Sequence, residues 1–333
     1  MTALTRRTLL AGAAATGALA ATASRAQGDL VDSGTPDLAG KSILITGTSS
    51  GFGRVGAEYY AGLGAKVFAT MRNLPRSEAE ELRQLATDKR LDLHVIEIDV
   101  LSDEQVAAGV AEAERINGGS IDVLVNNAGV GISGPVEVQD MEATRLAFDT
   151  NVFGYHRMAR AVLPGMRAKG SGQIFQISSQ LGRVIAPYGG HYSATKFAVE
   201  AMGEQLAYEL VPHNVEVTII EPGGYPTEVW VNRNIYTGAL KERAEDLHTS
   251  GYPQVVAAMG TEDGSGRSAD PMDVPRAIAR TIAMPGGTRP LRLPVSAGSI
   301  PQTAINEVSA RTQVEWLGRS ERLGPAIRAV HNV

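Results

Sequence analysis

Short apolar segments alternate with segments of helical periodicity along most of the chain. The apolar segments are rich in β-branched residues, which is typical of strands buried on both faces of a sheet. This alternation predicts an α/β fold with a doubly wound parallel sheet in three α/β/α layers. Strands are expected at residues 42–45, 66–70, 91–98, 121–125, 173–177, 215–220 and 291–295, and helices at 53–63, 76–88, 102–115, 141–167, 192–210, 271–283 and 303–317.

The same pattern predicts the domain organisation. We expect one domain over residues 41–295, preceded by a polar linker with Gly and Pro at residues 27–40. Between about residues 225 and 270 the pattern becomes irregular and polar, which predicts a variable lid over the substrate. Residues 296–333 are expected to form a helical tail.

The first 26 residues do not fit the pattern of the fold. Arg6 and Arg7 precede an Ala/Gly/Leu stretch at residues 11–23, and Ser24-Arg25-Ala26 offers a small-x-small cleavage site. We therefore expect a twin-arginine signal peptide at residues 1–26 and export of the folded protein to the periplasm. The alternative is an uncleaved alanine-rich helix or a disordered leader on a cytoplasmic protein. The apolar run is too short and too weakly hydrophobic to span a bilayer, so no stable membrane insertion is expected.

Composition narrows the classes of function. The 333 residues carry a net charge of −5 with no basic block, which argues against a nucleic-acid partner. The chain has no cysteine, so disulfides, cysteine nucleophiles and thiolate metal sites are excluded. Its six histidines have no spacing typical of metal ligands, and no metal site is expected.

A glycine-rich loop, TGTSSGFG at residues 46–53, lies between the first predicted strand and the first predicted helix. Gly47 allows a tight turn, Gly51 allows close approach of a phosphate, and Gly53 lets the helix pack on the strand. Backbone N–H groups at such a helix N-terminus can bind a dinucleotide pyrophosphate. In this position the loop predicts nucleotide binding by a Rossmann fold.

Tyr192 and Lys196 stand four residues apart on a predicted helix and therefore share one face of it. An ammonium group beside a phenol favours the phenolate, so we expect the pKa of Tyr192 to fall from its usual ~10 toward working pH. Such a tyrosine can both donate and accept a proton. Together with a phosphate-binding loop, the pair indicates hydride chemistry on a carbonyl or an alcohol.

In order and spacing, these motifs resemble the classical short-chain dehydrogenase/reductase family. The matching features are the glycine loop, Asp99-Val100, the NNAG run at residues 126–129, Asn151, Ser179 thirteen residues before Tyr192, Lys196, and Pro222-Gly223 with Thr227. The resemblance covers residues 41–295. The runs FATMR at residues 68–72 and DVLVNNAG at residues 122–129 are most similar to the branch that contains steroid and retinol dehydrogenases. The family also implies a homo-oligomer, either a dimer or a tetramer.

The resemblance implies a catalytic set of Asn151, Ser179, Tyr192 and Lys196. Tyr192 would exchange a proton with the substrate oxygen, while Lys196 would lower the pKa of Tyr192 and bind the nicotinamide ribose. Ser179 would donate a hydrogen bond to the substrate oxygen, and Asn151 would hold a water near Lys196. Taken alone, Ser179 is equally well read as a turn residue and Asn151 as an amide bonded within its helix.

The resemblance also implies where a nucleotide cofactor binds. Asp99 would accept a hydrogen bond from the adenine amino group, Asn126 and Ala128 would flank the adenosine, and residues 222–227 would approach the nicotinamide. Without the family, Asp99 is an ordinary turn aspartate and the other two segments simply end strands. The expected cofactor-binding residues are Gly47, Ser49, Ser50, Gly51, Phe52, Gly53, Arg72, Asp99, Val100, Asn126, Ala128, Gly129, Tyr192, Lys196, Pro222, Gly223 and Thr227.

The end of the second predicted strand bears on the choice between NADP and NAD. An NAD enzyme usually places Asp or Glu there to bind the ribose 2′-hydroxyl, whereas this chain has Thr70-Met71-Arg72. The guanidinium of Arg72 could pair with a 2′-phosphate, helped by the hydroxyl of Ser49. The alternative is a solvated surface arginine. We expect NADP as the cofactor, with NAD as the second choice.

The sequence thus predicts an NAD(P)-dependent oxidoreductase that interconverts a carbonyl and an alcohol on a small-molecule ketone, aldehyde or alcohol. Residues 225, 230, 235 and 236, all aromatic or aliphatic, could form an apolar wall for a lipophilic substrate or the core of the lid. His191 is expected to cap the helix or line the pocket rather than act as a base. Two other classes stay open. One is a non-catalytic NADP-binding regulatory protein on the same fold, and the other is an epimerase or dehydratase of the extended branch.

Overall fold

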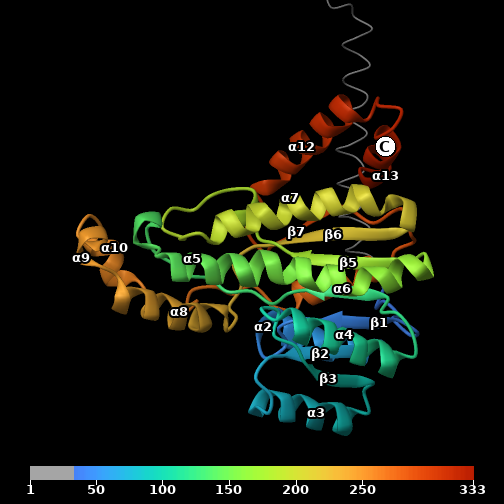
Figure 1. Cartoon of the computed structure of the whole chain (residues 1–333), viewed down its shortest axis with the longest axis horizontal. Coiled ribbons are helices and arrows are strands. Elements are labelled where there is room, and N and C mark those ends of the chain that lie inside the picture. The colour runs from blue at the N-terminus through green and yellow to red at the C-terminus, as the bar shows by residue number, and fades with distance from the viewer. Residues whose placement is uncertain (1–33) are drawn as a thin grey trace, which may run out of the picture.

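A single parallel sheet of seven strands forms the centre of the molecule (Figure 1). The computed structural model describes residues 34–333, so the expected export signal lies outside the described residues. The strands are β1 (Ser42–Ile45), β2 (Lys66–Met71), β3 (Leu93–Glu97), β4 (Val123–Asn126), β5 (Gly172–Ile177), β6 (Val215–Pro222) and β7 (Arg292–Val295). Their order is β3-β2-β1-β4-β5-β6-β7, and every neighbouring pair is parallel. The direction of winding reverses between β1 and β4, which confirms the predicted doubly wound fold.

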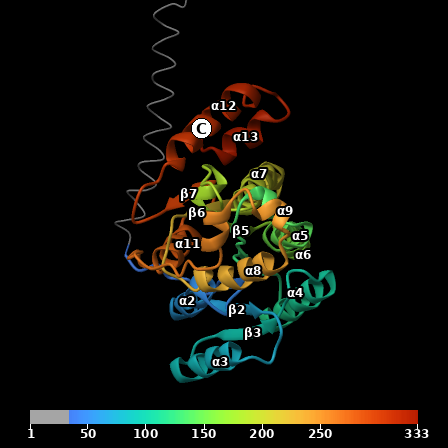
Figure 2. The same ribbon diagram turned by 90° about the vertical axis from the view of Figure 1, so that its left-hand side faces the viewer.

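Helices cover both faces of the sheet (Figure 2). They are α2 (Gly51–Gly62), α3 (Ser77–Lys89), α4 (Asp103–Asn117), α5 (Met141–Phe148), α6 (Gly154–Lys169), α7 (Tyr192–Leu210) and α11 (Asp273–Ala283). Tyr60 of α2, Leu82 of α3 and Ile278 of α11 belong to one buried apolar cluster. Residues of α4, α6 and α7, such as Met158, belong to a second cluster on the other face. The sheet therefore separates two cores, as the apolar strands predict.

The long helix expected at residues 141–167 is interrupted. Between α5 and α6 the backbone forms one π-helical turn, η2 (Asp149–Phe153), with Asn151 at its centre. Such turns insert an extra residue into a helix and occur often at functional sites. The insertion gives neighbouring residues different surroundings: Asn151 is fully buried, while Thr150 lines the cleft described below.

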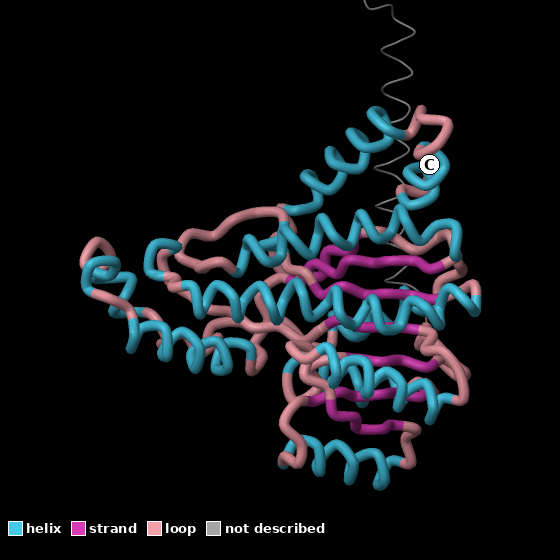
Figure 3. Tube along the Cα trace, in the orientation of Figure 1, coloured by secondary structure: helices cyan, strands magenta, loops and turns pink. Residues whose placement is uncertain are grey.

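The segment expected to be irregular after residue 225 is largely helical. It contains α8 (Val229–Arg243), α9 (Asp246–Thr249) and α10 (Pro253–Ala258), which lie beyond the carboxyl ends of the strands (Figures 1 and 3). The expectation of an irregular segment was wrong because α8 buries only Thr237 and Leu240, so its sequence carries no continuous apolar stripe.

Hydrogen bonds join α8 to three separate parts of the domain. Arg72 donates from Nη2 to the hydroxyl of Tyr236 at 2.7 Å, and Thr237 Oγ1 accepts from the Ser133 backbone N–H at 3.0 Å. At the far end of the helix, Arg243 pairs with Asp140. These contacts hold α8 across the carboxyl-terminal edge of the sheet.

The tail after β7 packs back on the domain through buried polar contacts. It forms α12 (Gln302–Leu317) and α13 (Gly324–Val330). Arg292 of β7 donates to Glu200 and Glu204 at 2.7 Å each and lies 3.7 Å from Glu221, while Asn306 of α12 donates to both carboxylate oxygens of Glu221. Burial raises the pKa of Glu221 above its ordinary value, and the nearby charge of Glu200 adds to the effect. The Arg292 cluster fixes the end of β6, which borders the cleft, and the middle of α7, whose first turns line it.

We predict that Arg292→Met destabilises the fold by about 3–5 kcal/mol, because it leaves buried carboxylates without a cation. Urea unfolding at neutral pH measures the change. Arg276→Met is the matched control, since its side chain is 41% exposed and its ion pairs with Asp270 and Asp273 lie at the surface. That control is expected to cost less than about 1 kcal/mol. Equal losses in the two variants would contradict the stabilising role of the buried cluster.

Candidate active site

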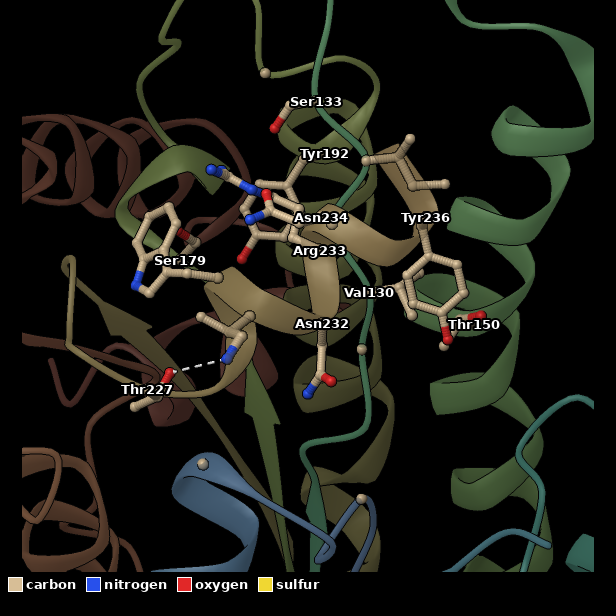
Figure 4. Close-up of a pocket in the computed structure, with 18 of the residues that line it drawn as sticks. Val130, Ser133, Thr150, Ser179, Tyr192, Thr227, Asn232, Arg233, Asn234 and Tyr236 are labelled. Carbon is tan, nitrogen blue, oxygen red and sulfur yellow. Dashed lines mark hydrogen bonds between the residues drawn. The ribbon is translucent and has the colours of Figure 1, made fainter. Parts of the chain in front are cut away.

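A cleft of about 1070 Å³ opens at the carboxyl ends of the strands, beneath α8 (Figure 4). It is lined by the loops after β1, β2, β3, β4, β5 and β6, and by the first turns of α7 and α8. In doubly wound sheets this edge, near the reversal of strand order, is where ligands bind. The volume is sufficient for a dinucleotide together with part of a small substrate.

The glycine loop has the geometry that its sequence predicts. Gly47 and Gly51 have φ values of 70° and 56°, which favour glycine. A Cβ on Gly47 would lie 2.8 Å from the Ala128 Cα, and a Cβ on Gly53 would lie 2.2 Å from the Gly47 carbonyl oxygen. Asn127 donates from Nδ2 to the carbonyl oxygens of Thr46 and Gly47 at 2.8 and 3.1 Å, which fixes the loop on the end of β4.

The N-terminus of α2 fits an anionic group. Its first turn contains no acidic residue, and the side chain of its N-cap, Ser50, makes no capping hydrogen bond. The backbone N–H groups there therefore face the cleft without a competing carboxylate, in the manner of a pyrophosphate site. Ser49, Ser50, Gly51 and Phe52 all line the cleft. These residues fit a dinucleotide.

The ends of β2 and β3 form a second, polar part of the cleft. Arg72 and Arg76 line it, and Asp99 is its one carboxylate. Asp99 Oδ1 accepts from the Leu101 backbone N–H at 3.0 Å, as a turn aspartate does. Arg76 is bound to Glu78, which lies outside the lining, whereas the hydrogen bond of Arg72 goes to the neutral hydroxyl of Tyr236. The guanidinium of Arg72 thus keeps its full positive charge toward this end of the cleft.

Ser179, Tyr192 and Lys196 meet in the middle of the cleft. Ser179 follows β5 and accepts from the Leu181 backbone N–H at 3.1 Å. Lys196, one turn after Tyr192 on α7, donates from Nζ to the Ile177 carbonyl oxygen at 2.8 Å. Its ammonium lies 5.6 Å from the centre of the Tyr192 ring and 5.4 Å from that of Tyr155. Sequence reasoning thus predicted three side chains that the fold brings together.

The direction of the Tyr192 pKa shift differs from the expectation. Burial raises the pKa of the Tyr192 phenol above its ordinary value, while the hydrogen bond with Ser179 and the charge of Arg233 oppose the rise. The expected lowering by Lys196 was wrong, because its ammonium is bound to a backbone carbonyl rather than to the phenol oxygen. Burial in turn lowers the pKa of Lys196 to about 8, against the opposing charge of Glu200.

Asn151 lies next to this group but does not line the cleft. Its Oδ1 accepts from the Val130 backbone N–H at 2.8 Å, and its Nδ2 donates to the Val130 carbonyl at 2.8 Å and to Thr195 Oγ1 at 3.1 Å. Thr195 in turn donates to the Tyr192 carbonyl oxygen at 2.7 Å. The amide therefore joins the loop after β4 to the first turn of α7, as a positioning residue would.

The predicted site residues fall into two groups, those that line the cleft and those that do not. Those that line the cleft are Gly47, Ser49, Ser50, Gly51, Phe52, Arg72, Asp99, Val100, Ala128, Gly129, Ser179, Tyr192, Lys196, Pro222, Gly223 and Thr227. Gly53 packs against the glycine loop instead. Asn126, expected beside the adenosine, is fully buried and donates to Gln176 Oε1 at 3.0 Å. His191 is also absent from the lining, because its ring bonds to Thr144 at 3.2 Å, and its side chain makes no cap on α7.

Sequence reasoning missed a charged group on the lid side of the cleft. Arg233 of α8 and Arg267 both pair with Glu262, at 2.7 and 2.5 Å. Their guanidinium carbons lie 4.5 and 3.7 Å from the centre of the Trp230 ring. Figure 4 shows Arg233 and Tyr192 in the same part of the cleft. Trp230, expected as apolar wall or lid core, thus has two cations stacked on its ring. Only the helical period of α8 could have placed Arg233 near it.

Two further observations concern residues 34–333. Within them, no helix combines the length and the apolar character needed to cross a bilayer. The same residues contain no group of three or more His, Cys, Asp or Glu side chains arranged to hold a metal ion.

Comparison with known proteins identifies the family. Residues 41–236 match the model of the short chain dehydrogenase family. Retinol dehydrogenase 8 of Homo sapiens is 34% identical over 304 residues, 85% of this chain and 92% of that protein. A 3-ketodihydrosphingosine reductase of Bacteroides thetaiotaomicron is 39% identical over 208 residues, 62% of this chain and 72% of that protein. Among solved structures, a short-chain dehydrogenase from Streptomyces avermitilis is similar with a TM-score of 0.63 and 29% identity, covering 85% of this chain and 98% of that one.

These matches confirm the family resemblance, including its steroid and retinol branch. The family match spans the glycine loop, β1 to β6 and the Tyr192/Lys196 helix, which are the parts that build the cleft. The chain belongs to the short-chain dehydrogenase family and is an oxidoreductase that interconverts a carbonyl group and an alcohol by hydride transfer.

Proposed function

We propose that this protein is an NADP-preferring carbonyl reductase in which Tyr192 is the general acid and base. The observation that carries the proposal is the meeting of Tyr192, Ser179 and Lys196 in one cleft with a glycine loop of nucleotide-binding geometry. When bound, the nicotinamide supplies the hydride for reduction or accepts it in oxidation. The residues described below orient the substrate and move the proton.

Reduction needs a proton donor beside the carbonyl oxygen. Because burial raises the pKa of Tyr192, this side chain is a neutral phenol at neutral pH and holds the proton to be given. Ser179, oriented by its bond to the Leu181 N–H, can donate to the same carbonyl oxygen while negative charge develops there. As the carbonyl carbon receives the hydride, the phenol O–H bond breaks and the proton goes to the oxygen, which yields the alcohol.

Tyr192 is left as a phenolate and must regain its proton. The hydrogen bond with Ser179 and the guanidinium of Arg233 stabilise the phenolate. A pKa of about 8 lets Lys196 exchange protons near neutral pH, so it is suited to return the proton through water in the cleft. In alcohol oxidation the same groups act in the opposite direction.

Preference for NADP rests on charge at the ends of β2 and β3. Arg72 carries an uncompensated guanidinium there, and its one hydrogen bond within the described residues goes to Tyr236. A 2′-phosphate would replace a neutral hydroxyl partner by a charge-assisted one, which is about twice as strong. The Ser49 hydroxyl lines the same region. A ribose of NAD gives Arg72 no comparable partner, so the charge favours NADP.

Location and assembly are also proposed from the sequence. Arg6, Arg7 and the site at residues 24–26 would direct the folded protein, with its nucleotide bound, through twin-arginine export to the periplasm. The tight nucleotide contacts proposed for Arg72 would help retain the cofactor there. A homodimer or homotetramer remains the expected assembly.

Tyr192→Phe is predicted to lower kcat by about 10²–10⁴, because the ring stays but the transferable proton is lost. A substrate is first chosen by following NADPH oxidation against ketones, aldehydes, steroids and retinoids. Tyr252→Phe is the matched control, since that hydroxyl bonds Glu137 outside the cleft. Nucleotide affinity should stay unchanged in both variants. Near-normal turnover by Tyr192→Phe would refute the assignment.

Arg72→Ala is predicted to weaken NADPH binding by roughly 10- to 100-fold and to change NADH binding little, since only NADPH offers a phosphate to the guanidinium. Fluorescence titration of both nucleotides measures the dissociation constants. Tyr236→Phe removes the lid partner of Arg72 but keeps the cation, so it separates phosphate binding from loosening of α8. NADH preference by the wild type, or the same NADPH loss in Tyr236→Phe, contradicts the proposal.

Export predicts a mature protein that begins near Gln27 and fractionates with the periplasm. Replacing Arg6 and Arg7 by lysine should leave an uncleaved precursor in the cytoplasm, because the twin arginine is the recognised element. Cell fractionation with N-terminal sequencing of wild type and double variant checks this. A wild-type chain that keeps residues 1–26 in the cytoplasm rules export out and leaves the enzyme assignment intact.

A further inference from the structure

The cleft is strongly positive although the chain as a whole is not. The protein carries a net charge of −5, yet the lining of the cleft contains five cationic side chains against two carboxylates. The cations are Arg72, Arg76, Lys196, Arg233 and Arg267, and the carboxylates are Asp99 and Glu262. Arg72 and Arg76 lie where the adenosine phosphate is proposed to bind, and Lys196 is part of the catalytic group. Of the two remaining arginines, Arg267 has no role in the proposed hydride transfer, and Arg233 acts there only through its charge on the Tyr192 phenol.

Arg233 and Arg267 share a single counter-ion. Arg233 donates from Nη2 and Arg267 from Nη2 to the two carboxylate oxygens of Glu262. The exposed carboxylate of Asp263 also acts on Arg267, so Glu262, shared with Arg267, is the ion-pair partner left to Arg233 among residues 34–333. Within residues 34–333, the hydrogen bonds of Arg233 use only Nη2, and its Nε is buried without a partner. The Arg233 side chain is 20% exposed, so a ligand oxygen can reach the guanidinium from the cleft and add a hydrogen bond to a charged donor.

The arginine pair is held in place rather than free to move. The Trp230 ring beneath both guanidinium groups is fixed by the bond from its Nε1 to the Tyr225 carbonyl oxygen at 2.7 Å. The stem of Arg233 lies against Gly131, where an added Cβ would be 3.1 Å from the Arg233 Cδ. Such preorganisation is what recognition of a planar anion by arginine requires.

The position of Arg233 points to the substrate rather than the nucleotide. Its charge acts on the Tyr192 phenol, so it lies on the catalytic side of the cleft. The lining of the cleft also includes Ile132, Val255, Ala258 and Met259, which are apolar. The site thus combines a proton donor, an apolar wall and a lid arginine, Arg233, that shares its carboxylate partner with Arg267.

We propose that the substrate is an oxo acid, or the corresponding hydroxy acid, whose carboxylate binds Arg233 while its carbonyl oxygen faces Tyr192 and Ser179. This inference rests on the proposed carbonyl reduction and adds the substrate class. Glu262 holds the two arginines together and partly neutralises the positive charge that the substrate carboxylate meets. The alternative is that the ion pairs of Glu262 only hold the lid closed. The experiment must distinguish this role from recognition of the substrate carboxylate.

The test compares levulinate and its longer methyl-ketone homologues with their methyl esters, which differ only in charge at one end. Turnover is followed through NADPH. Binding is followed separately on the complex with oxidised NADP, by quenching of Trp230 fluorescence. Trp316→Phe removes the other of the two tryptophans, which is 72% exposed on the tail. At the best chain length the acid is expected to bind roughly 10- to 100-fold more tightly than its ester.

Three variants distinguish carboxylate recognition from lid closure. Arg233→Met should abolish the preference for the acid. Glu262→Gln keeps a hydrogen-bond acceptor but removes the negative charge, so it should tighten acid binding. If the ion pair only holds the lid closed, Glu262→Gln should instead weaken acid binding in the same way as Arg233→Met. Arg243→Met, which breaks the lid pair with Asp140 outside the cleft, should leave the preference unchanged.

The results separate this inference from the proposed function. Equal binding of acid and ester, a retained preference in Arg233→Met, or parallel losses in Arg233→Met and Glu262→Gln each overturns carboxylate recognition. If the acid and the ester are reduced at equal rates, the proposed reductase function stands and the proposal of an oxo acid substrate is overturned. Selective binding of the acid with no turnover in the wild type keeps the carboxylate site and counts against the proposed reaction.

Discussion

The carbonyl oxygen of Ile177, at the end of β5, is the acceptor on which the arrangement of the site depends. It receives hydrogen bonds from the Lys196 ammonium at 2.8 Å and from the Tyr155 hydroxyl at 3.1 Å, both from buried side chains. A buried ammonium without a partner would be expelled or neutralised. This one acceptor therefore fixes α7 and α6 on the end of β5. The serine that follows the strand is thereby brought opposite the tyrosine that begins α7.

Sequence patterns predicted most of this frame because the frame obeys local rules. Apolar strands such as Ser42–Ile45 are buried on both faces, and the Tyr192–Leu210 helix begins and ends where its residues indicate. The glycine loop was equally readable, since Gly47 and Gly51 adopt backbone angles that few other residues accept. In these parts each local preference agrees with the global fold.

What the sequence did not reveal depends on long-range contacts. The direction of the Tyr192 pKa shift could not be predicted from its spacing to Lys196, because burial dominates the shift and the ammonium is bound to the Ile177 carbonyl oxygen. Asn126 and Asn127 are alike in sequence, yet one is buried against Gln176 while the other holds the glycine loop. The lid helix α8 buries few residues, so no apolar stripe predicted a helix there or the position of Arg233 in the cleft.

The Arg292 cluster has a consequence for the order in which the fold forms during synthesis. Glu221 is fully buried, and the two side chains that meet its carboxyl group, Arg292 and Asn306, are translated long after β6. Until they leave the ribosome, a Glu221 side chain buried at the end of β6 would lack both partners, so the loop of Pro222 and Gly223 is not yet fixed in place. The α2 helix after the glycine loop also depends on a late segment, because its Tyr60 shares a buried apolar cluster with Ile278 of α11. Both the nucleotide side and the substrate side of the cleft are therefore completed only after translation has passed β7.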